Sequence, residues 1–447
     1  MRIYCNALQK AVVTLFAFTW SVTLHAQNQP PSITDVKVQL TEDNQVKIRY
    51  VVKDKEEKNI SVDFYVSTDD GKTFTKQTAG VQGDVGASVA TGKKSMSWNY
   101  SDFKSDIKNA KFRLVADDGF KLNVADLVAQ VDTNRLRARL TAITGIRDNF
   151  SELGKAQLGK VKNIIQTNFT GNNFSFRRQP FVFGGYSGEN FIAKKIGTRK
   201  QDSIYVVVAA FDGAENSPAA NNNGSGLAGL LEISDIISKY NFKNTVVVLS
   251  TDYTAEEFVG SKYFVFRGGI EKHERVDAAL DLDRIGTFSN APNTHPLEAN
   301  DADLFPKMYE QIKADSARAN FLRIISNPLS RPLADKFKDA AARYVPDLKI
   351  HTQEYPGYGE FVRGTFSYVQ FSDHICFWYR KYKALWLSDA REGSRRDNTS
   401  EDDVNMINFK FLSDVVKISL ATLVEMAGLE HSGVYEGSFV QTAMALK

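Results

Sequence analysis

Two runs of apolar residues constrain the fold of this chain more than any other feature of its sequence. Ile204–Phe211 and Thr245–Ser250 are apolar along nearly their whole length, which is typical of strands that are buried on both faces. Between these runs, leucine and isoleucine recur with helical spacing from Leu227 to Ile237. Buried strands that alternate with amphipathic helices predict an α/β domain with a mostly parallel sheet covered by helices.

This α/β domain is predicted to span residues 131–427. Its first two helices are expected at Asn134–Ile143 and near Gly154–Thr167, where apolar residues again recur with helical spacing. The remaining predicted elements are two strands and a closing helix, at Ala278–Asp283, Ala384–Ser388 and Asn405–Met426.

The preceding part of the chain has a different pattern, because apolar and polar residues alternate there. Val36–Leu40, Val46–Tyr50 and Ser61–Ser67 show this period of two, which indicates half-buried strands. About seven short strands separated by turns predict a small all-β, immunoglobulin-like sandwich over residues 27–122. Residues 123–130 are then expected to be a linker, and residues 428–447 a C-terminal extension.

The first 26 residues are typical of a secretory signal peptide. Arg2 and Lys10 give a positive start, Ala11–Thr23 is mostly apolar, and Leu24-His25-Ala26 precedes a cleavage point. The apolar stretch is shorter than the roughly 20 residues of a membrane-spanning helix. After cleavage Cys376 is the remaining cysteine, so no internal disulfide is expected. We expect a periplasmic or secreted protein without a transmembrane segment after signal cleavage.

The net charge of the chain indicates which classes of partner are not expected. The formal charge is +3, and removal of the signal peptide, which holds Arg2 and Lys10 and no acid, leaves +1. A near-neutral protein without a basic run is a poor match for nucleic acid or an anionic membrane. A peptide or an envelope protein is a candidate partner, and the sequence does not identify it.

Polar residues gather where the predicted strands end. Asp212 and Asp283 each follow a buried strand, Asn221–Gly226 opens the predicted helix, and Glu256 and Glu257 follow the second strand. Because functional groups of α/β sheets lie at the carboxyl ends of the strands, we expect these residues to approach one another.

Six short motifs contain or neighbour these residues: Ala210-Phe211-Asp212, Asn222-Asn223-Gly224-Ser225-Gly226, Glu256-Glu257-Phe258-Val259-Gly260-Ser261, Asp281-Leu282-Asp283-Arg284-Ile285-Gly286, Ser372-Asp373-His374-Ile375-Cys376-Phe377 and Asp397-Asn398-Thr399-Ser400-Glu401-Asp402. In sequence and in order they resemble the di-zinc aminopeptidase family, which also contains the glutaminyl cyclases. The resemblance covers residues 131–427. It implies a zinc-aminopeptidase-like fold for the α/β domain.

The resemblance also implies a set of zinc ligands: two histidines, a bridging aspartate, a glutamate and a second aspartate, with another glutamate as general base. Here Glu256 stands at the general-base position, and Glu257 and Asp283 stand at retained ligand positions. The positions of the two histidines and the bridging aspartate are occupied by Ala210, Asn398 and Asn222, respectively. Three of the five ligand positions are therefore lost.

Residues near these positions favour structural roles. The resemblance places His374 beside the site as a hydrogen-bonded scaffold residue, and we expect it to line the site together with Asp212. Cys376 is interpreted as a buried structural thiol. Gly224-Ser225-Gly226 favours a helix N-cap over a phosphate-binding loop, because no lysine follows it.

The ligand losses favour a non-catalytic binding or scaffold protein with a degenerate zinc site and no cofactor. One alternative is a metal-dependent aminopeptidase-type hydrolase with an atypical zinc site and Glu256 as base. A glutaminyl-cyclase-like enzyme is the other, but the resemblance implies an Asp, a Glu and a His on its zinc, and two of these are missing. The sequence leaves open whether the chain is an enzyme.

Without metal, the clustered acids need another source of positive charge. We expect a guanidinium within salt-bridge distance of Glu257 or Asp283, and at least one acid of the cluster with a raised pKa. The arginines near the site in sequence are Arg284, Arg391, Arg395 and Arg396.

Overall fold

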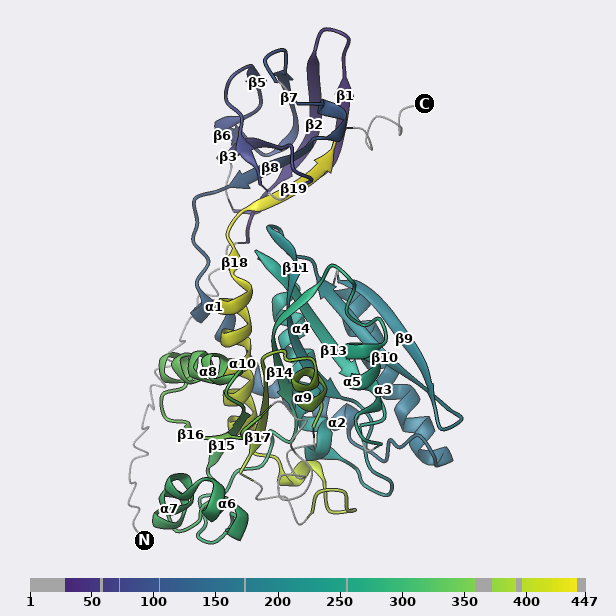
Figure 1. Cartoon of the computed structure of the whole chain (residues 1–447), viewed down its shortest axis with the longest axis vertical. Helices are drawn as coiled ribbons and strands as arrows, with labels where there is room; N and C mark the ends of the chain where they lie inside the picture. The colour runs from purple at the N-terminus through teal and green to yellow at the C-terminus, as the bar shows by residue number, and fades with distance from the viewer. Residues whose placement is uncertain are drawn as a thin grey trace, which may run out of the picture.

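The structure, a computed structural model, describes residues 29–439 except 57–58, 72, 104, 173, 255, 358–371 and 391–395. It consists of a smaller all-β part and a larger α/β part (Figure 1). The predicted signal peptide lies outside the described residues. Among the described helices, none combines the length and the apolar character needed to cross a bilayer.

The all-β part contains two antiparallel sheets that share one apolar core. This core includes Ile48 and Trp98 from the first sheet and Phe64 and Phe112 from the second. The strand order of the first sheet is β1 (Ser32–Leu40), β2 (Gln45–Lys53), β7 (Gly92–Asn99) and β5 (Val81–Gly83). The second sheet has the order β19 (Gly433–Ser438), β8 (Lys111–Asp117), β3 (Asn59–Ser67) and β4 (Thr75–Lys76), with β6 (Gly86–Ala90) also paired to β3. The predicted all-β domain ahead of the α/β domain is confirmed.

The last described strand belongs to this all-β part rather than to the α/β part. β19 pairs antiparallel with β8 along its whole length. Beyond it, the ring of Phe439 lies 5.1 Å from that of Phe112 and 6.2 Å from that of Trp98, measured between centroids. The boundaries predicted at residues 27–122 and 428–447 therefore miss one strand. Its partner is about 320 residues away in sequence (Arg113 bonds Glu436, 323 positions apart), so local periodicity does not reveal the pairing.

The stretch predicted as a linker, residues 123–130, is ordered in a short helix. α1 (Val124–Val128) starts where the side chain of Asn123 accepts a hydrogen bond from the backbone N–H of Ala125. Leu127 and Val128 are buried in the core of the α/β part. These residues therefore pack as the first element of that part.

An eight-stranded sheet forms the centre of the α/β part. Its order is β16 (Lys349–Glu354), β15 (Phe321–Ser326), β17 (Ala384–Asp389), β14 (Arg275–Leu282), β11 (Lys200–Ala210), β13 (Asn244–Thr251), β10 (Tyr186–Lys195) and β9 (Ser175–Phe183). The central strands β17, β14, β11 and β13 are parallel, as predicted. The flanking pairs β10/β13, β9/β10 and β15/β17 are antiparallel, so the sheet is mixed.

Helices cover both faces of this sheet, as Figure 1 shows. Val207 and Ala209 of β11 belong to the core on one face, whereas Val206 and Val208 belong to the core on the other. The helices of the first face are α2 (Thr133–Ile143), α3 (Glu152–Gly171), α4 (Gly226–Ile237), α8 (Arg331–Tyr344) and α10 (Phe409–Ala427). Those of the second are α5 (Val259–Phe266) and α9 (His374–Tyr379).

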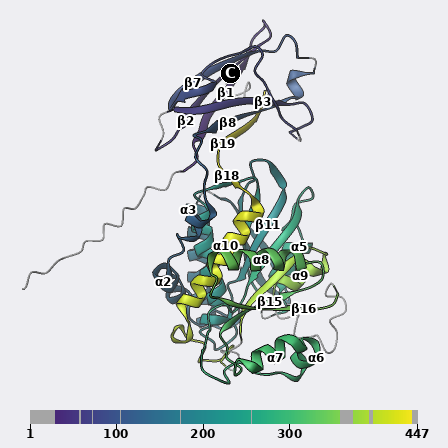
Figure 2. The same ribbon diagram turned by 90° about the vertical axis from the view of Figure 1, so that its left-hand side faces the viewer.

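The all-β part lies beyond the amino ends of the central strands. Residues at the starts of β11 and β14, among them Ser203 and Arg275, share one cavity with Gly71 and Lys111 of the all-β part. The two-stranded pair of β12 (Asn241–Phe242) and β18 (Leu429–Glu430) lies where the chain leaves α10. At the opposite end of the molecule lie α6 (Ala299–Leu304) and α7 (Pro306–Ala314) (Figure 2).

Candidate functional site

A cavity of about 250 Å³ lies at the carboxyl ends of the central strands. β11 supplies Ala210 and, just beyond its end, Asp212; Asp283 follows β14. Asn222, from the turn before α4, and Asn398, from the segment before α10, complete this group. The structure thus brings the three positions at which the resemblance implies lost ligands to one cavity, together with Asp283, at which it implies a retained one.

The turn that carries Asn222 is fixed by contacts on two sides. The carboxylate of Asp402 accepts hydrogen bonds from the backbone N–H groups of Asn221 at 2.6 Å and Asn222 at 3.0 Å. On the other side, a Cβ atom at Gly226 would stand 2.0 Å from the carbonyl oxygen of Leu282. Only glycine permits this approach of the helix to the end of β14. Two of the sequence motifs therefore serve to place the loop.

The two asparagines at lost ligand positions bond to each other. Nδ2 of Asn222 donates to Oδ1 of Asn398 at 2.8 Å. The pair joins a position that the resemblance assigns to a bridging carboxylate with one that it assigns to a histidine. Both replacements are neutral, and the bond satisfies one donor and one acceptor without a metal ion.

Arg284 supplies positive charge inside the cavity. Its guanidinium lies 3.3 Å from the carboxylate of Asp283 and 3.9 Å from that of Asp397, and 5.0 Å from the ring centroid of Trp386. The predicted contact between an arginine and Asp283 is confirmed for Arg284. Arg391 and Arg395 lie outside the described residues. The sequence did not single out Asp397, whose burial raises its pKa to about 7 although Arg284 lowers it.

The predicted approach of Glu256 and Glu257 to this cavity is wrong for the described structure. Glu257 has 89% of its side chain exposed and pairs with Lys262 at 3.2 Å. Glu256 is half-buried and does not line the cavity. The physical reason lies in Phe258, which packs on the apolar core beneath α5 and lines the cavity. With Phe258 turned inward at a φ of 60°, the preceding residue faces solvent.

Asp212 is the buried acid of the cavity. Its Oδ2 accepts a hydrogen bond from the backbone N–H of Thr254 at 2.9 Å, and its Oδ1 has no partner among the described residues. Burial, followed by the negative charge of Asp252, raises the pKa of Asp212 to about 8. The prediction that at least one clustered acid has a raised pKa is confirmed, and the neutral acid is favoured at pH 7.

His374 is beside the site but does not line its cavity. Its ring is fully buried, 4.6 Å from the Trp378 ring and 5.3 Å from the Trp386 ring. Neither ring nitrogen has a hydrogen-bond partner among the described residues, so the prediction of a hydrogen-bonded imidazole is wrong. Its backbone N–H instead donates to Asp281 at 2.8 Å. Burial lowers the pKa of His374 to about 3, so the imidazole is neutral, and its Nδ1 lies 3.6 Å from the carboxylate of Asp281.

Arg147 is a structural residue of the site that sequence reasoning missed. The side chain is fully buried and donates to the carbonyl oxygens of Phe211, Pro218 and Ala219 at 2.9, 3.0 and 2.7 Å. These bonds shape the segment that follows β11 and leads to the turn with Asn222. A lone arginine between two predicted helices gives no signal for such a role, because its partners are backbone carbonyls.

A comparison with protein families matches this chain at residues 190–423 to peptidase family M28, and that span is more than half of the chain. The chain belongs to peptidase family M28. This agrees with the resemblance to zinc aminopeptidases that the six motifs carry.

Curated relatives of this M28 chain match a similar region. The uncharacterized protein YfbL of Escherichia coli is 24% identical over 229 residues, which are 48% of this chain and 64% of that protein. A probable zinc metalloprotease of Leptosphaeria maculans is 22% identical over 253 residues, which are 52% of this chain and 56% of that protein. The matched segment therefore spans less than two thirds of either relative.

Solved structures show the same fold. LapB from Legionella pneumophila superposes with a TM-score of 0.53 at 17% identity, covering 69% of this chain and 77% of LapB. LapA from the same organism gives 0.52 at 13% identity, covering 82% and 100%. An aminopeptidase from Aneurinibacillus gives 0.51 at 12% identity, covering 69% and 97%. At these identities the likeness establishes the zinc-aminopeptidase-like fold alone.

Membership of the M28 family makes zinc a relevant ion, but the donors of this cavity do not fit a two-zinc site. Asp283 already pairs with a guanidinium, and the amides of Asn222 and Asn398 bond to each other. In the part of the chain that the structure describes, one group of three potential ligand residues brings its donor atoms within 4.8 Å of one another. That group, Glu271, His273 and Glu274, is not part of the cavity, and Lys194 pairs with both of its glutamates.

Proposed function

We propose that this chain is a non-catalytic binding or scaffold protein, built on the M28 peptidase fold and exported to the bacterial envelope. The observation that carries the proposal is the arrangement of the three lost ligand positions around Arg284. Ala210 has no donor atom, Asn222 and Asn398 bond to each other, and the guanidinium pairs with Asp283. A fixed cation beside the remaining carboxylate opposes the approach of a divalent ion.

The proposed ligand of the cavity is the end of a peptide or an exposed segment of another envelope protein. The cavity presents acid, amide and guanidinium groups from Asp212, Asn222, Asn398, Asp283 and Arg284. Such groups recognise polar termini and backbone amides by hydrogen bonds. The export rests on residues 1–26, whose pattern is typical of a signal peptide. The all-β part then acts as a spacer or an adhesive unit.

Metal analysis tests the proposal directly. The mature protein, purified without chelator, is expected to carry well under one equivalent of zinc by elemental analysis. It is also expected to leave aminoacyl-nitroanilides uncleaved. Stoichiometric zinc together with chelator-sensitive cleavage would overturn the proposal.

That outcome would support the alternative, a hydrolase with an atypical metal site. A Glu256→Gln variant then decides the role of the carboxylate at the general-base position. Loss of cleavage in this variant, with zinc content unchanged, would assign proton transfer to Glu256. Equal cleavage by both proteins would instead point to a contaminating peptidase.

A further inference from the structure

A second pocket lies at the opposite end of the central strands, next to their amino ends. Its volume is about 420 Å³, which is within the usual range for a site that holds a small organic molecule. β11 and β14 form one wall, and α8, α10 and the residue before β17 form the others. The cavity that contains Asp212 and Asp283 lies at the carboxyl ends of these strands and shares no lining residue with this pocket.

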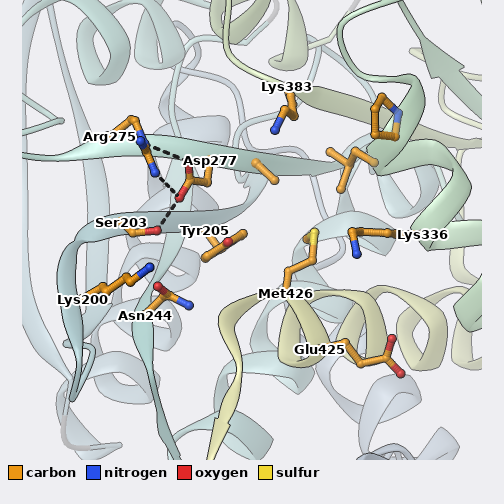
Figure 3. A pocket seen from close by; sticks show the side chains of 13 residues that line it. Lys200, Ser203, Tyr205, Asn244, Arg275, Asp277, Lys336, Lys383, Glu425 and Met426 are labelled. Carbon is orange, nitrogen blue, oxygen red and sulfur yellow. Dashed lines mark hydrogen bonds and ion pairs between the residues drawn. The ribbon is translucent and has the colours of Figure 1, made fainter.

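Three lysines from three separate elements line the pocket. Lys200 starts β11, Lys336 lies on α8, and Lys383 directly precedes β17. Figure 3 shows them on different sides of the pocket. Among the described residues, none of the three forms an ion pair or a side-chain hydrogen bond. Their ammonium groups are therefore available to a ligand.

The acids that line the same pocket are already neutralised by other groups. Asp277 pairs with Arg275, at 2.9 Å between Nε and Oδ1, and accepts a hydrogen bond from the hydroxyl of Ser203 (Figure 3). Glu425 pairs with Arg343 and accepts a hydrogen bond from the hydroxyl of Tyr344 at 3.0 Å. The net charge that the pocket presents is therefore positive.

Two further features favour an anion with an organic body. The first turn of α8, with Pro332 and Leu333, forms part of the wall, and the amino end of a helix carries a partial positive charge. Tyr205, Leu333 and Met426 add apolar surface to the same wall. A ligand with several anionic groups and a compact carbon skeleton matches both kinds of wall.

We propose that this pocket binds a soluble small molecule that carries two or three phosphate or carboxylate groups. Lysine suits such groups because its ammonium is a compact point charge with three donors. Three like charges around one volume also repel one another, and a multivalent anion removes that repulsion. The pocket thus gives the chain a ligand site that is independent of the M28 cavity and of its proposed function.

Calorimetric titration of the full mature chain tests the proposal, with sodium tripolyphosphate and citrate as the probes. At low ionic strength we expect saturable binding of at least one probe, weakened at high ionic strength because the charges are solvent-accessible. The triple variant Lys200→Gln, Lys336→Gln, Lys383→Gln is expected to bind about tenfold or more weakly, a loss of about 1.4 kcal/mol. Thermal unfolding of each protein verifies that it is folded.

A control variant removes the same number of charges elsewhere. Lys37→Gln, Lys160→Gln, Lys307→Gln changes three exposed lysines that form no ion pair among the described residues and do not line the pocket. This variant is expected to bind within about twofold of the wild type, because the net charge alone is a weak determinant of binding at a defined site. Equal losses in the two variants, or no binding of either probe to the wild type, would overturn the proposal.

Vesicles that contain phosphatidylglycerol separate a soluble ligand from a lipid headgroup. Co-sedimentation is expected to be absent, or equal for the two triple variants. Vesicle binding that is lost only in the pocket variant, without binding of the soluble probes, would overturn the proposal in favour of a membrane surface.

Discussion

The charged side chains at the two ends of the central strands differ in whether they have partners within the fold. At the carboxyl edge, Arg284 lies between Asp283 and Asp397 and is four-fifths buried, with 19% of its side chain exposed. At the amino edge, Lys336 and Lys383 are exposed and form no ion pair among the described residues. A charge that is paired within the fold serves stability, whereas a charge without a partner is available for recognition. At the carboxyl ends of the central strands, the described cation therefore has partners within the fold.

Among the variants considered, removal of Arg284 should lower the free energy of unfolding most. Arg284→Met keeps most of the side-chain volume but leaves two acids without their cation, one of which is Asp283 at the cavity. We expect a loss of about 3 kcal/mol in the free energy of unfolding, at the low end for a buried pair because the arginine is partly exposed. Denaturant unfolding measures this loss.

Lys383→Gln at the amino edge is the matched control for Arg284→Met. Its effect should stay within about 0.5 kcal/mol, because an exposed lysine without a partner contributes little to stability. Comparable losses for the two variants would contradict the distinction between the edges.

Asp212 should make the stability of the chain depend on pH. The raised pKa means that the folded state holds a proton that the unfolded state has released between about pH 4 and pH 8, so stability falls as pH rises through this window. Asp212→Asn removes this loss while the side-chain oxygen still accepts from Thr254. The variant should be clearly more stable than the wild type at pH 8 and about equal to it at pH 4. Parallel pH profiles of the two proteins in denaturant unfolding would show that Asp212 is ionised in the fold.

The bond between the two asparagines should give the smallest of the three effects. Asn222→Ala removes the donor to Oδ1 of Asn398, which should cost about 1 kcal/mol. The double variant Asn222→Ala, Asn398→Ala removes both partners and should lose less than the sum of the two single variants. A double-mutant cycle of unfolding free energies measures the coupling. Additive losses would mean that the two side chains do not interact in solution.

Local sequence patterns predicted the elements of this chain well because their causes are local. The full burial of β11 and β13 follows from uninterrupted apolar runs, and the helical spacing in α4 and α10 follows from the need to cover that sheet. The antiparallel flank of β9 and β10 was missed. β9 is largely exposed, so its residues carry little of the apolar signal that identifies a strand.

The identity and order of the motifs predicted part of the candidate site. The motifs placed Ala210, Asn222, Asn398 and Asp283 at one edge, and the structure brings them to one cavity. They did not predict the outward turn of Glu257, which depends on how Phe258 packs against the core beneath α5. Which of two neighbouring side chains points inward depends on how each of them packs in the folded core, and a local motif does not contain that information.

The sequence by itself determined the fold class and the family, and through the resemblance it predicts the loss of three ligand positions, because each of these depends on residue identity and local order. The tertiary structure alone decided which distant groups contact one another. Arg284 pairs with two acids, Asn222 bonds to Asn398, and β19 pairs with β8. It also decided that Lys200, Lys336 and Lys383, each unremarked in sequence, surround one pocket. Such contacts join residues that are far apart along the chain, so they are set by strand register and helix packing rather than by any local pattern.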